Sequence, residues 1–275
     1  MSRKELDIQT LQRIGEKLPD LDNLKKMIMP LAPDFISSSF EPDSMVPVAA
    51  VCLRDALDTL YAARYALHEV YAHQIAYLEQ ADEPNEGVAA FFGRYYADDL
   101  ALRLYAASEH LAFAISAMLQ ISSAEIEPFL NKKGRASYAI VVGKYLADIK
   151  PDHPITSSVL ALARLPEWRK TMRYRNDWVH QQPPLVNGLG IAWQRRKRWE
   201  VVDQPDGSKI RMLNFGGGDP AEYSVEDLLA FMKPALEQFA RTLANVSEHY
   251  IDLIQAKGIT KSGITLSITL GQRRN

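Results

Sequence analysis

The stretch DDLALRLYAASEHL, residues 98–111, decides the fold of this chain. Drawn as a helix, it carries apolar side chains on nearly every side, with only a few polar residues among them. A helix of this kind needs neighbours on every side, because each apolar face must be removed from water. It lies within a longer helical segment, residues 88–121. We therefore predict that this segment is the central helix of a bundle.

Two further long segments have helical apolar spacing. Residues 47–80 contain no Pro or Gly after Pro47, and a helix of about thirty residues is typical of a bundle. Near the other end of the chain, Ser224 and Asp227 have the spacing of a capping box, which predicts the start of a last helix that reaches about residue 256. Both segments are expected to pack beside the central one.

The middle of the chain completes the expected bundle. Residues 135–149 fit a short helix. A buried strand is the alternative, because Ile140, Val141 and Val142 are all β-branched. Residues 155–180 fit a helix with a break at Pro166. The fold class predicted is all-α (mainly α), with four or five long antiparallel helices and a β-hairpin inserted before the last one.

The expected organisation has three parts. Residues 1–45 contain several prolines that prevent a long helix, and we expect an arm that packs on the main body. Residues 46–257 form the helical bundle, with residues 188–218 as its hairpin insertion. Residues 258–275 form a tail whose alternating residues could add one strand to that hairpin.

The hairpin is expected from residues 191–202 and 209–215, two alternating segments joined by a turn that contains Pro205-Asp206-Gly207. Arg and Lys interleaved with Trp suit contact with the phosphates and bases of RNA. The alternative is an edge hairpin protected from aggregation by its charges. The predicted RNA-binding residues are Trp193, Arg195, Arg196, Lys197, Arg198 and Trp199, with Arg173 on the preceding helix.

Charge and composition exclude several classes of protein. Nine basic and three acidic residues lie between residues 164 and 200, so this region is positive although the whole chain has a formal net charge of −2. Cys52 is the only cysteine, which excludes an internal disulfide and a thiolate metal cluster. The chain also lacks a His-Glu-x-x-His motif, a Gly-x-Ser-x-Gly motif, and the dinucleotide and P-loop fingerprints. We expect no metal and no cofactor.

The compartment follows from two further features of the sequence. The first ten residues lack the apolar segment of a signal peptide, and the longest apolar run, about residues 111–121, is too short to span a bilayer. We expect a cytoplasmic protein without membrane contact.

The segment LPEWRKTMRYRNDWVH, residues 165–180, carries the most chemistry. Its helical stripe of apolar residues contains Trp168, Met172 and Val179, and Arg175 occupies the place where the pattern requires a core side chain. Asn176 and His180 are four residues apart, so their side chains share one edge of the helix. The sequence therefore gathers a guanidinium, an amide and an imidazole at one end of a helix.

Glu109 interrupts the most apolar part of the central helix. A buried carboxylate needs a partner, and Arg175 is the predicted one. The alternative is that Glu109 lies at a solvated edge of the bundle.

The pattern Arg175-Asn176, then His180, resembles the signature of the HEPN superfamily (higher eukaryotes and prokaryotes nucleotide-binding). Members are helical bundles with an Arg, four to six residues, and then a His, often with Asn, Asp or His directly after the Arg. Arg103 with His110 and Arg173 with His180 also fit the spacing, but only Arg175 is followed by Asn and lies at a core position. The resemblance covers residues 47–257.

The resemblance implies a metal-independent endoribonuclease. His180 would remove the proton of a ribose 2′-OH, and Arg175 would hold the scissile phosphate and stabilise its developing charge. Asn176 would orient these groups and Glu109 would fix Arg175. The products would be a 2′,3′-cyclic phosphate and a 5′-OH.

The resemblance also implies a homodimer in which two such motifs face one cleft, and an antitoxin or nucleotidyltransferase as partner in a toxin–antitoxin or defence system. Two alternatives remain open at this point. The chain could be an inactive HEPN-like module that binds RNA, nucleotides or proteins, or Arg175 and His180 could form a purely structural pair.

Overall fold

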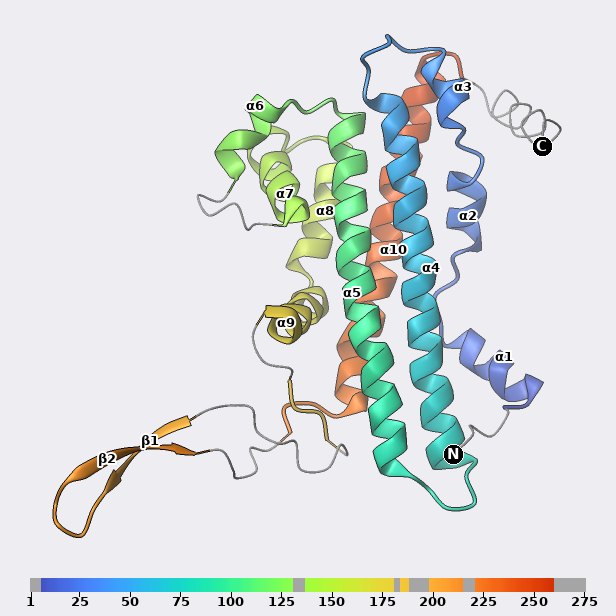
Figure 1. The fold of residues 1–275 in the computed structure, drawn as a ribbon. Helices are drawn as coiled ribbons and strands as arrows, with labels where there is room; N and C mark the ends of the chain where they lie inside the picture. Colours follow the sequence, from blue (N-terminus) through green and yellow to red (C-terminus); the bar gives the residue numbers. More distant parts are fainter. Residues whose placement is uncertain (1–5, 131–136, 181–183, 188–197, 215–220, 260–275) are drawn as a thin grey trace.

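The computed structural model describes residues 6–130, 137–180, 184–187, 198–214 and 221–259, and all structural statements below refer to them. Three long helices run side by side: α4 (Val46–Gln74), α5 (Glu86–Met118) and α10 (Val225–Ala256) (Figure 1). α5 contacts α4, α7, α9 and α10. The prediction of a mainly α fold with a central helix at residues 98–111 is therefore confirmed.

The predicted boundaries of these helices lie close to the observed ones. α4 continues into a π-helical turn, η1 (Ile75–Glu79), before the break at residues 81–85. Asn85 caps α5 by accepting a hydrogen bond from the Val88 N–H, and the predicted capping box of Ser224 and Asp227 begins α10. Local capping chemistry therefore sets where two of the three long helices start.

The expectation of four or five long antiparallel helices is wrong in the number of long helices and in the direction of one of them. α4 and α5 are antiparallel, but α10 runs in the same direction as α5, and these three alone exceed twenty residues in the described parts of the chain (Figure 1). α10 cannot follow α5 directly, since the chain must return to the same end of the bundle. Residues 119–224 provide that return as shorter elements.

Close packing of the long helices depends on Gly93 of α5. An ideal Cβ at this position would lie 2.8 Å from Nε2 of Gln74 on α4 and 2.9 Å from Cγ1 of Val225 on α10. A side chain here would displace the flexible end of Gln74 and press on the branched side chain of Val225, so space rather than backbone conformation favours glycine.

The shorter helices cover one side of α5 (Figure 1). They are α6 (Ser123–Ile126), the 3₁₀ turn η2 (Glu127–Phe129), α7 (Tyr138–Ile149), α8 (Pro154–Arg164) and α9 (Pro166–His180). Residues 138–149 are helical, so the strand alternative for this segment is wrong. The predicted break at Pro166 is confirmed, because Leu165 has extended backbone angles (φ −60°, ψ 123°) and separates α8 from α9.

The opposite side of the bundle carries three short helices, α1 (Ile8–Glu16), α2 (Asp22–Ile28) and α3 (Pro33–Ser37) (Figure 1). α1, α2 and α3 contact α4, and α2 also contacts α10. Leu21, Ile28, Leu31 and Ile36 are at most 2% exposed and belong to the main hydrophobic core. This segment is thus packed as tightly as the bundle itself.

The inserted hairpin consists of β1 (Arg198–Asp203) and β2 (Lys209–Asn214), paired antiparallel with Val201 opposite Arg211. Gly207 adopts φ +83° in the connecting turn, a conformation that favours glycine. The predicted hairpin is confirmed for these residues. The earlier part of its first strand, residues 191–197, and the strand expected in the tail lie outside the described residues.

A short parallel contact connects the hairpin insertion to the bundle. Val186 and Tyr223 form a β-bridge, and the N–H of Asn187 donates to the carbonyl of Tyr223 at 2.8 Å. The segments that enter and leave the insertion are therefore joined just before α10 begins.

Among the described helices, none combines the length and apolar character that a bilayer crossing requires.

Candidate functional site

The site is built on α9, and a buried polar contact fixes this helix against α5. The hydroxyl of Tyr174 donates to Oδ1 of Asp98 at 2.5 Å, and Nε of Arg94 lies 3.5 Å from the other carboxylate oxygen. Burial raises the pKa of Asp98, and burial together with the carboxylate raises the pKa of Tyr174. The contacts of Arg94, Asp98 and Tyr174 therefore fix α9 against α5 at the residue next to Arg175.

The buried face of α9 differs from the predicted stripe. Tyr174 and Thr171 are fully buried and Trp168 is 8% exposed, whereas Val179 is 40% exposed. The expected core position of Val179 is therefore wrong. Arg175 is half-buried, so a guanidinium does occupy part of the inward face.

Arg175, Asn176 and His180 lie together at the C-terminal end of α9. Nη1 of Arg175 donates to Oδ1 of Asn176 at 3.0 Å and is 3.3 Å from Nε2 of His180. The Arg175 guanidinium lies over the ring of Tyr105 on α5, with its carbon 3.8 Å from the ring centre. The predicted guanidinium, amide and imidazole therefore meet, with Tyr105 as a support that the spacing of α9 could not reveal.

The contact between Arg175 and His180 constrains the imidazole. Arginine has no hydrogen-bond acceptor, so a hydrogen bond across this contact requires the His180 tautomer in which Nε2 accepts and Nδ1 carries the proton. The imidazole is exposed and the guanidinium is held on one side by an aromatic ring. This arrangement places an imidazole beside a fixed positive charge.

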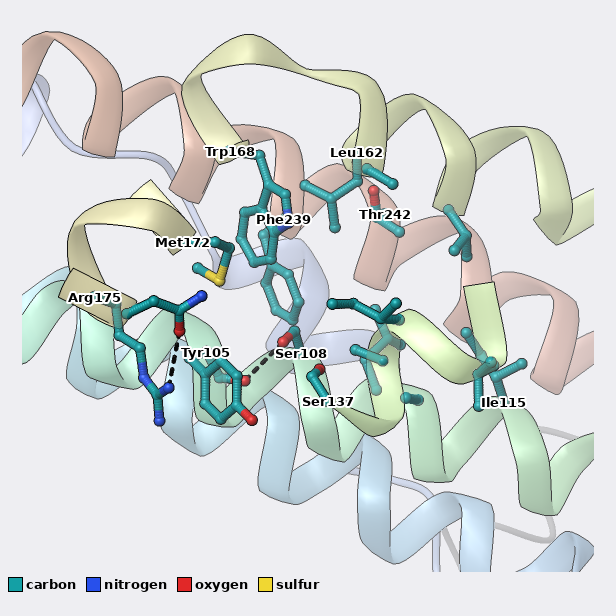
Figure 2. A pocket seen from close by; sticks show the side chains of 18 of the residues that line it. Tyr105, Ser108, Ile115, Ser137, Leu162, Trp168, Met172, Arg175, Phe239 and Thr242 are labelled. Atoms are coloured by element: carbon teal, nitrogen blue, oxygen red, sulfur yellow. Dashed lines mark hydrogen bonds between the residues drawn. The ribbon is translucent and has the colours of Figure 1, made fainter. Parts of the chain in front are cut away.

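These residues line one end of a pocket of about 410 Å³ between α5, α7, α8, α9 and α10. Figure 2 shows Arg175 and Tyr105 at one end, Trp168 and Phe239 in the middle and Ile115 at the other end. Most of the lining side chains are apolar, although the hydroxyls of Ser108, Ser137 and Thr242 also line the pocket away from Arg175. The pocket therefore has a guanidinium at one end and a largely hydrocarbon lining.

The expected pairing of Glu109 with Arg175 is wrong. The Glu109 carboxylate accepts hydrogen bonds from the N–H groups of Tyr138 at 3.0 Å and Ala139 at 3.4 Å, and from the hydroxyl of Ser137. The free N–H groups at the start of α7 attract a carboxylate because they carry partial positive charge. Glu109 therefore caps α7 and leaves Arg175 without an acidic partner among the described residues.

The predicted RNA-binding residues are only partly placed. Arg173 is on the outer side of α9, with its side chain 81% exposed and its Nε 3.8 Å from a carboxylate oxygen of Asp177. Trp193, Arg195, Arg196 and Lys197 lie outside the described residues. Arg198 and Trp199 belong to β1, where their backbones pair with Asn214 and Leu213, and their side chains are not described.

The structure adds two contributors that sequence reasoning did not select. Tyr105 supports the guanidinium, and Asp98 anchors α9 through Tyr174. The only signal in the sequence is that both interrupt an otherwise apolar helix. In the described parts of the chain, no three His, Cys, Asp or Glu side chains gather in a way that could hold a metal ion.

Similarity to known proteins gives no further guide to this site. A comparison of the chain with models of protein families, with curated proteins and with solved structures found no match.

Proposed function

We propose that this chain is a HEPN-like, metal-independent endoribonuclease whose site consists of Arg175, Asn176 and His180. One observation supports this most directly: Nη1 of Arg175 is 3.3 Å from Nε2 of an exposed His180. A phosphodiester bound to the guanidinium would place its neighbouring ribose next to the imidazole. General-base catalysis requires the base to be within hydrogen-bond reach of the proton that it removes.

In the proposed reaction, Nε2 of His180 gives up its hydrogen bond with Arg175 and accepts the proton of the ribose 2′-OH. The 2′ oxygen then forms a bond to phosphorus, and the bond from phosphorus to the 5′ oxygen breaks. The leaving 5′ oxygen takes a proton from solvent. Arg175 stabilises the charge on the phosphoryl oxygens, and Asn176 holds the guanidinium in place.

The remaining parts of the proposal concern partners. RNA would follow the positive region that includes Arg173 and the hairpin residues around Arg195 and Arg198. A homodimer would bring two copies of the Arg175–His180 pair to one cleft. An antitoxin or nucleotidyltransferase is the proposed regulator. Because the proposed substrate is RNA, we also propose a cytoplasmic location.

A second candidate is a module that binds RNA or nucleotides without cleaving them. The observation that favours it is that both Asn176 and His180 already contact Nη1 of Arg175, so the three side chains are satisfied without a substrate. In that case Arg175 would bind phosphate and His180 would only position it.

Cleavage of RNA in the presence of EDTA tests the first proposal. The full-length protein should produce 2′,3′-cyclic phosphate ends, and RNA with a 2′-deoxyribose at the cleaved position should stay intact. His180→Ala should slow cleavage by about 10²–10⁴-fold, because a general base contributes about this much. Cleavage that needs a divalent metal, or that persists in His180→Ala, contradicts the proposal.

Arg173 supplies a matched control for Arg175. Both are on α9 and both have an allowed spacing to His180, but Arg173 faces solvent and pairs with Asp177. Arg175→Gln should abolish cleavage, whereas Arg173→Gln should weaken only the affinity for RNA and its dependence on salt. Equal loss of cleavage in both variants would mean that general positive charge matters, not the site.

A further inference from the structure

The pocket behind Arg175 is larger and more apolar than cleavage of a phosphodiester requires. Its volume of about 410 Å³ lies within the range of about 300–1,000 Å³ that is typical of small-molecule sites. We propose that this pocket binds an amphipathic anion, a medium-chain carboxylate or a close analogue. The hydrocarbon chain occupies the interior, and the acidic headgroup lies on Arg175.

The interior favours hydrocarbon over a polar ligand such as a nucleobase. Three aliphatic hydroxyl groups line the pocket, and each already donates its hydrogen to the protein. Ser108 donates to the carbonyl of Tyr105 at 2.7 Å, Thr242 donates to the carbonyl of Gln238 at 3.0 Å, and Ser137 donates to Glu109. The carbonyl and ring-nitrogen acceptors of a base would therefore find no donor among these three hydroxyls, which disfavours their burial beside them.

The other walls are aliphatic and aromatic. Leu111 and Ile115 of α5, Val142 of α7, Leu162 of α8 and Phe239 of α10 all line the cavity. Each methylene of a ligand that they remove from water should strengthen binding about fourfold. Ser137 and Ile115 are set apart along the pocket, so a flexible chain can extend from one toward the other (Figure 2).

The entrance favours a negative headgroup. Arg175 uses Nη1 for Asn176 and His180, while Nη2 makes no hydrogen bond to the described residues. No described carboxylate forms an ion pair with this guanidinium, because Glu109 caps α7 and Asp177 faces Arg173. The two N–H groups of Nη2 can therefore donate to a carboxylate, and the support of Tyr105 keeps the guanidinium in place for it.

Binding of decanoate to the full-length protein tests the proposal by calorimetry. Affinity should rise about fourfold per methylene from butanoate upward, and level off when the pocket is full. Decanol and decyltrimethylammonium, which have the same chain without a negative charge, should bind at least about tenfold more weakly. Absence of decanoate binding, or equal affinity for all three head groups, overturns the proposal.

Two alanines of α8 locate the ligand. Ala163 and Ala161 are both exposed, but only Ala163 lines the pocket. Ala163→Trp should reduce decanoate affinity about tenfold or more because the indole would occupy part of the pocket, and Ala161→Trp should leave it unchanged. If neither substitution changes the affinity, decanoate binds elsewhere and the proposal fails.

Arg175→Met separates charge from shape. This variant should keep decanol binding but lose the preference for decanoate, with a melting temperature that shows the fold is intact. AMP tests the competing class of ligand, a nucleotide. If AMP binds more tightly than decanoate and Ala163→Trp blocks its binding, the pocket binds a nucleobase and the proposal fails. None of these results depends on RNA cleavage, so the pocket and the proposed nuclease can fail separately.

Discussion

Arg175 is a charged residue that the protein keeps half-buried without an acidic partner among the described residues. Its face is covered by Tyr105 at 3.8 Å, and its Nε is buried without a hydrogen bond. An unmet donor and an uncompensated charge cost stability, so the cation–π contact must offset part of that cost. The orientation of the guanidinium, and with it the site, therefore depends on an aromatic ring from a different helix.

Replacing Tyr105 should loosen Arg175 without removing it. Tyr105→Leu should lower the rate of RNA cleavage about 2- to 30-fold, since a cation–π contact contributes about 0.5–2 kcal/mol, while Tyr105→Phe should behave like the parent. NMR gives a readout that does not depend on activity. The ring current of Tyr105 should shift the Arg175 Nε–H resonance, and in Tyr105→Leu this resonance should move back toward its usual chemical shift. An unchanged resonance in Tyr105→Leu would show that the ring does not hold the guanidinium.

Asp98 should make stability depend on pH in a defined direction. Burial raises its pKa in the folded protein above the unfolded value, so ionisation is harder in the folded state. Its contribution to the free energy of unfolding is therefore fully present below the unfolded pKa and is lost as pH rises through the folded pKa. Denaturant unfolding should be measured for the parent and for Asp98→Asn, which keeps an acceptor for Tyr174. As pH rises above about 4, the free energy of unfolding of the parent should fall relative to that of Asp98→Asn. A difference independent of pH would contradict this.

At the scale of elements, Glu109 acts on α7 and not on Arg175 and His180. Its carboxylate accepts from two N–H groups of the first turn of α7 and from Ser137. The capping role couples α5 to the helix that forms one wall of the pocket. It also explains why a carboxylate interrupts the apolar run of α5 without an arginine beside it.

Glu109→Ala should therefore lower stability and leave the chemistry intact. Loss of a helix cap costs about 0.5–2 kcal/mol, and Glu109→Gln should lose less because its amide oxygen can still accept. Thermal unfolding gives the stability, and RNA cleavage measured well below the midpoint gives the activity. A loss of cleavage as large as that of His180→Ala, with unchanged stability, would restore Glu109 to the catalytic site.

The sequence predicted those elements whose signals are local. The long helices follow from apolar spacing and capping residues such as Ser224, the break between α8 and α9 from Pro166, and the hairpin from the turn at Gly207. It did not predict the partner of Glu109, which lies 28 or more residues away in a segment whose docking no spacing rule defines. The position of Tyr105 under Arg175 was missed for the same reason. The meeting of Arg175 with His180 was predicted, because both belong to one helix.

At the scale of the whole molecule, α2, α3 and the bundle share one core. Ile28 of α2 is fully buried in the same cluster as Leu60 of α4 and Leu236 of α10. Such continuity predicts that the arm and the bundle unfold together, since neither buries its apolar surface alone.

Ile28 and its neighbour Met29 test this cooperativity. Ile28→Ala should reduce the free energy of unfolding by about 2–5 kcal/mol while keeping a single transition, because it leaves a cavity in the shared core. Met29→Ala, at a position 44% exposed, should change it by no more than about 0.5 kcal/mol. Two separate transitions in Ile28→Ala would show that the arm is an independent unit.

The pocket behind Arg175 also has a mechanical consequence. Apolar walls hold water poorly, so the part of the pocket that they enclose leaves the bundle with volume that disappears when the chain unfolds. Hydrostatic pressure favours the smaller state, and this protein should therefore yield to compression more readily than a fully packed bundle of its size. Whatever fills the pocket, a ligand or the ring of Ala163→Trp, should stiffen the molecule against pressure.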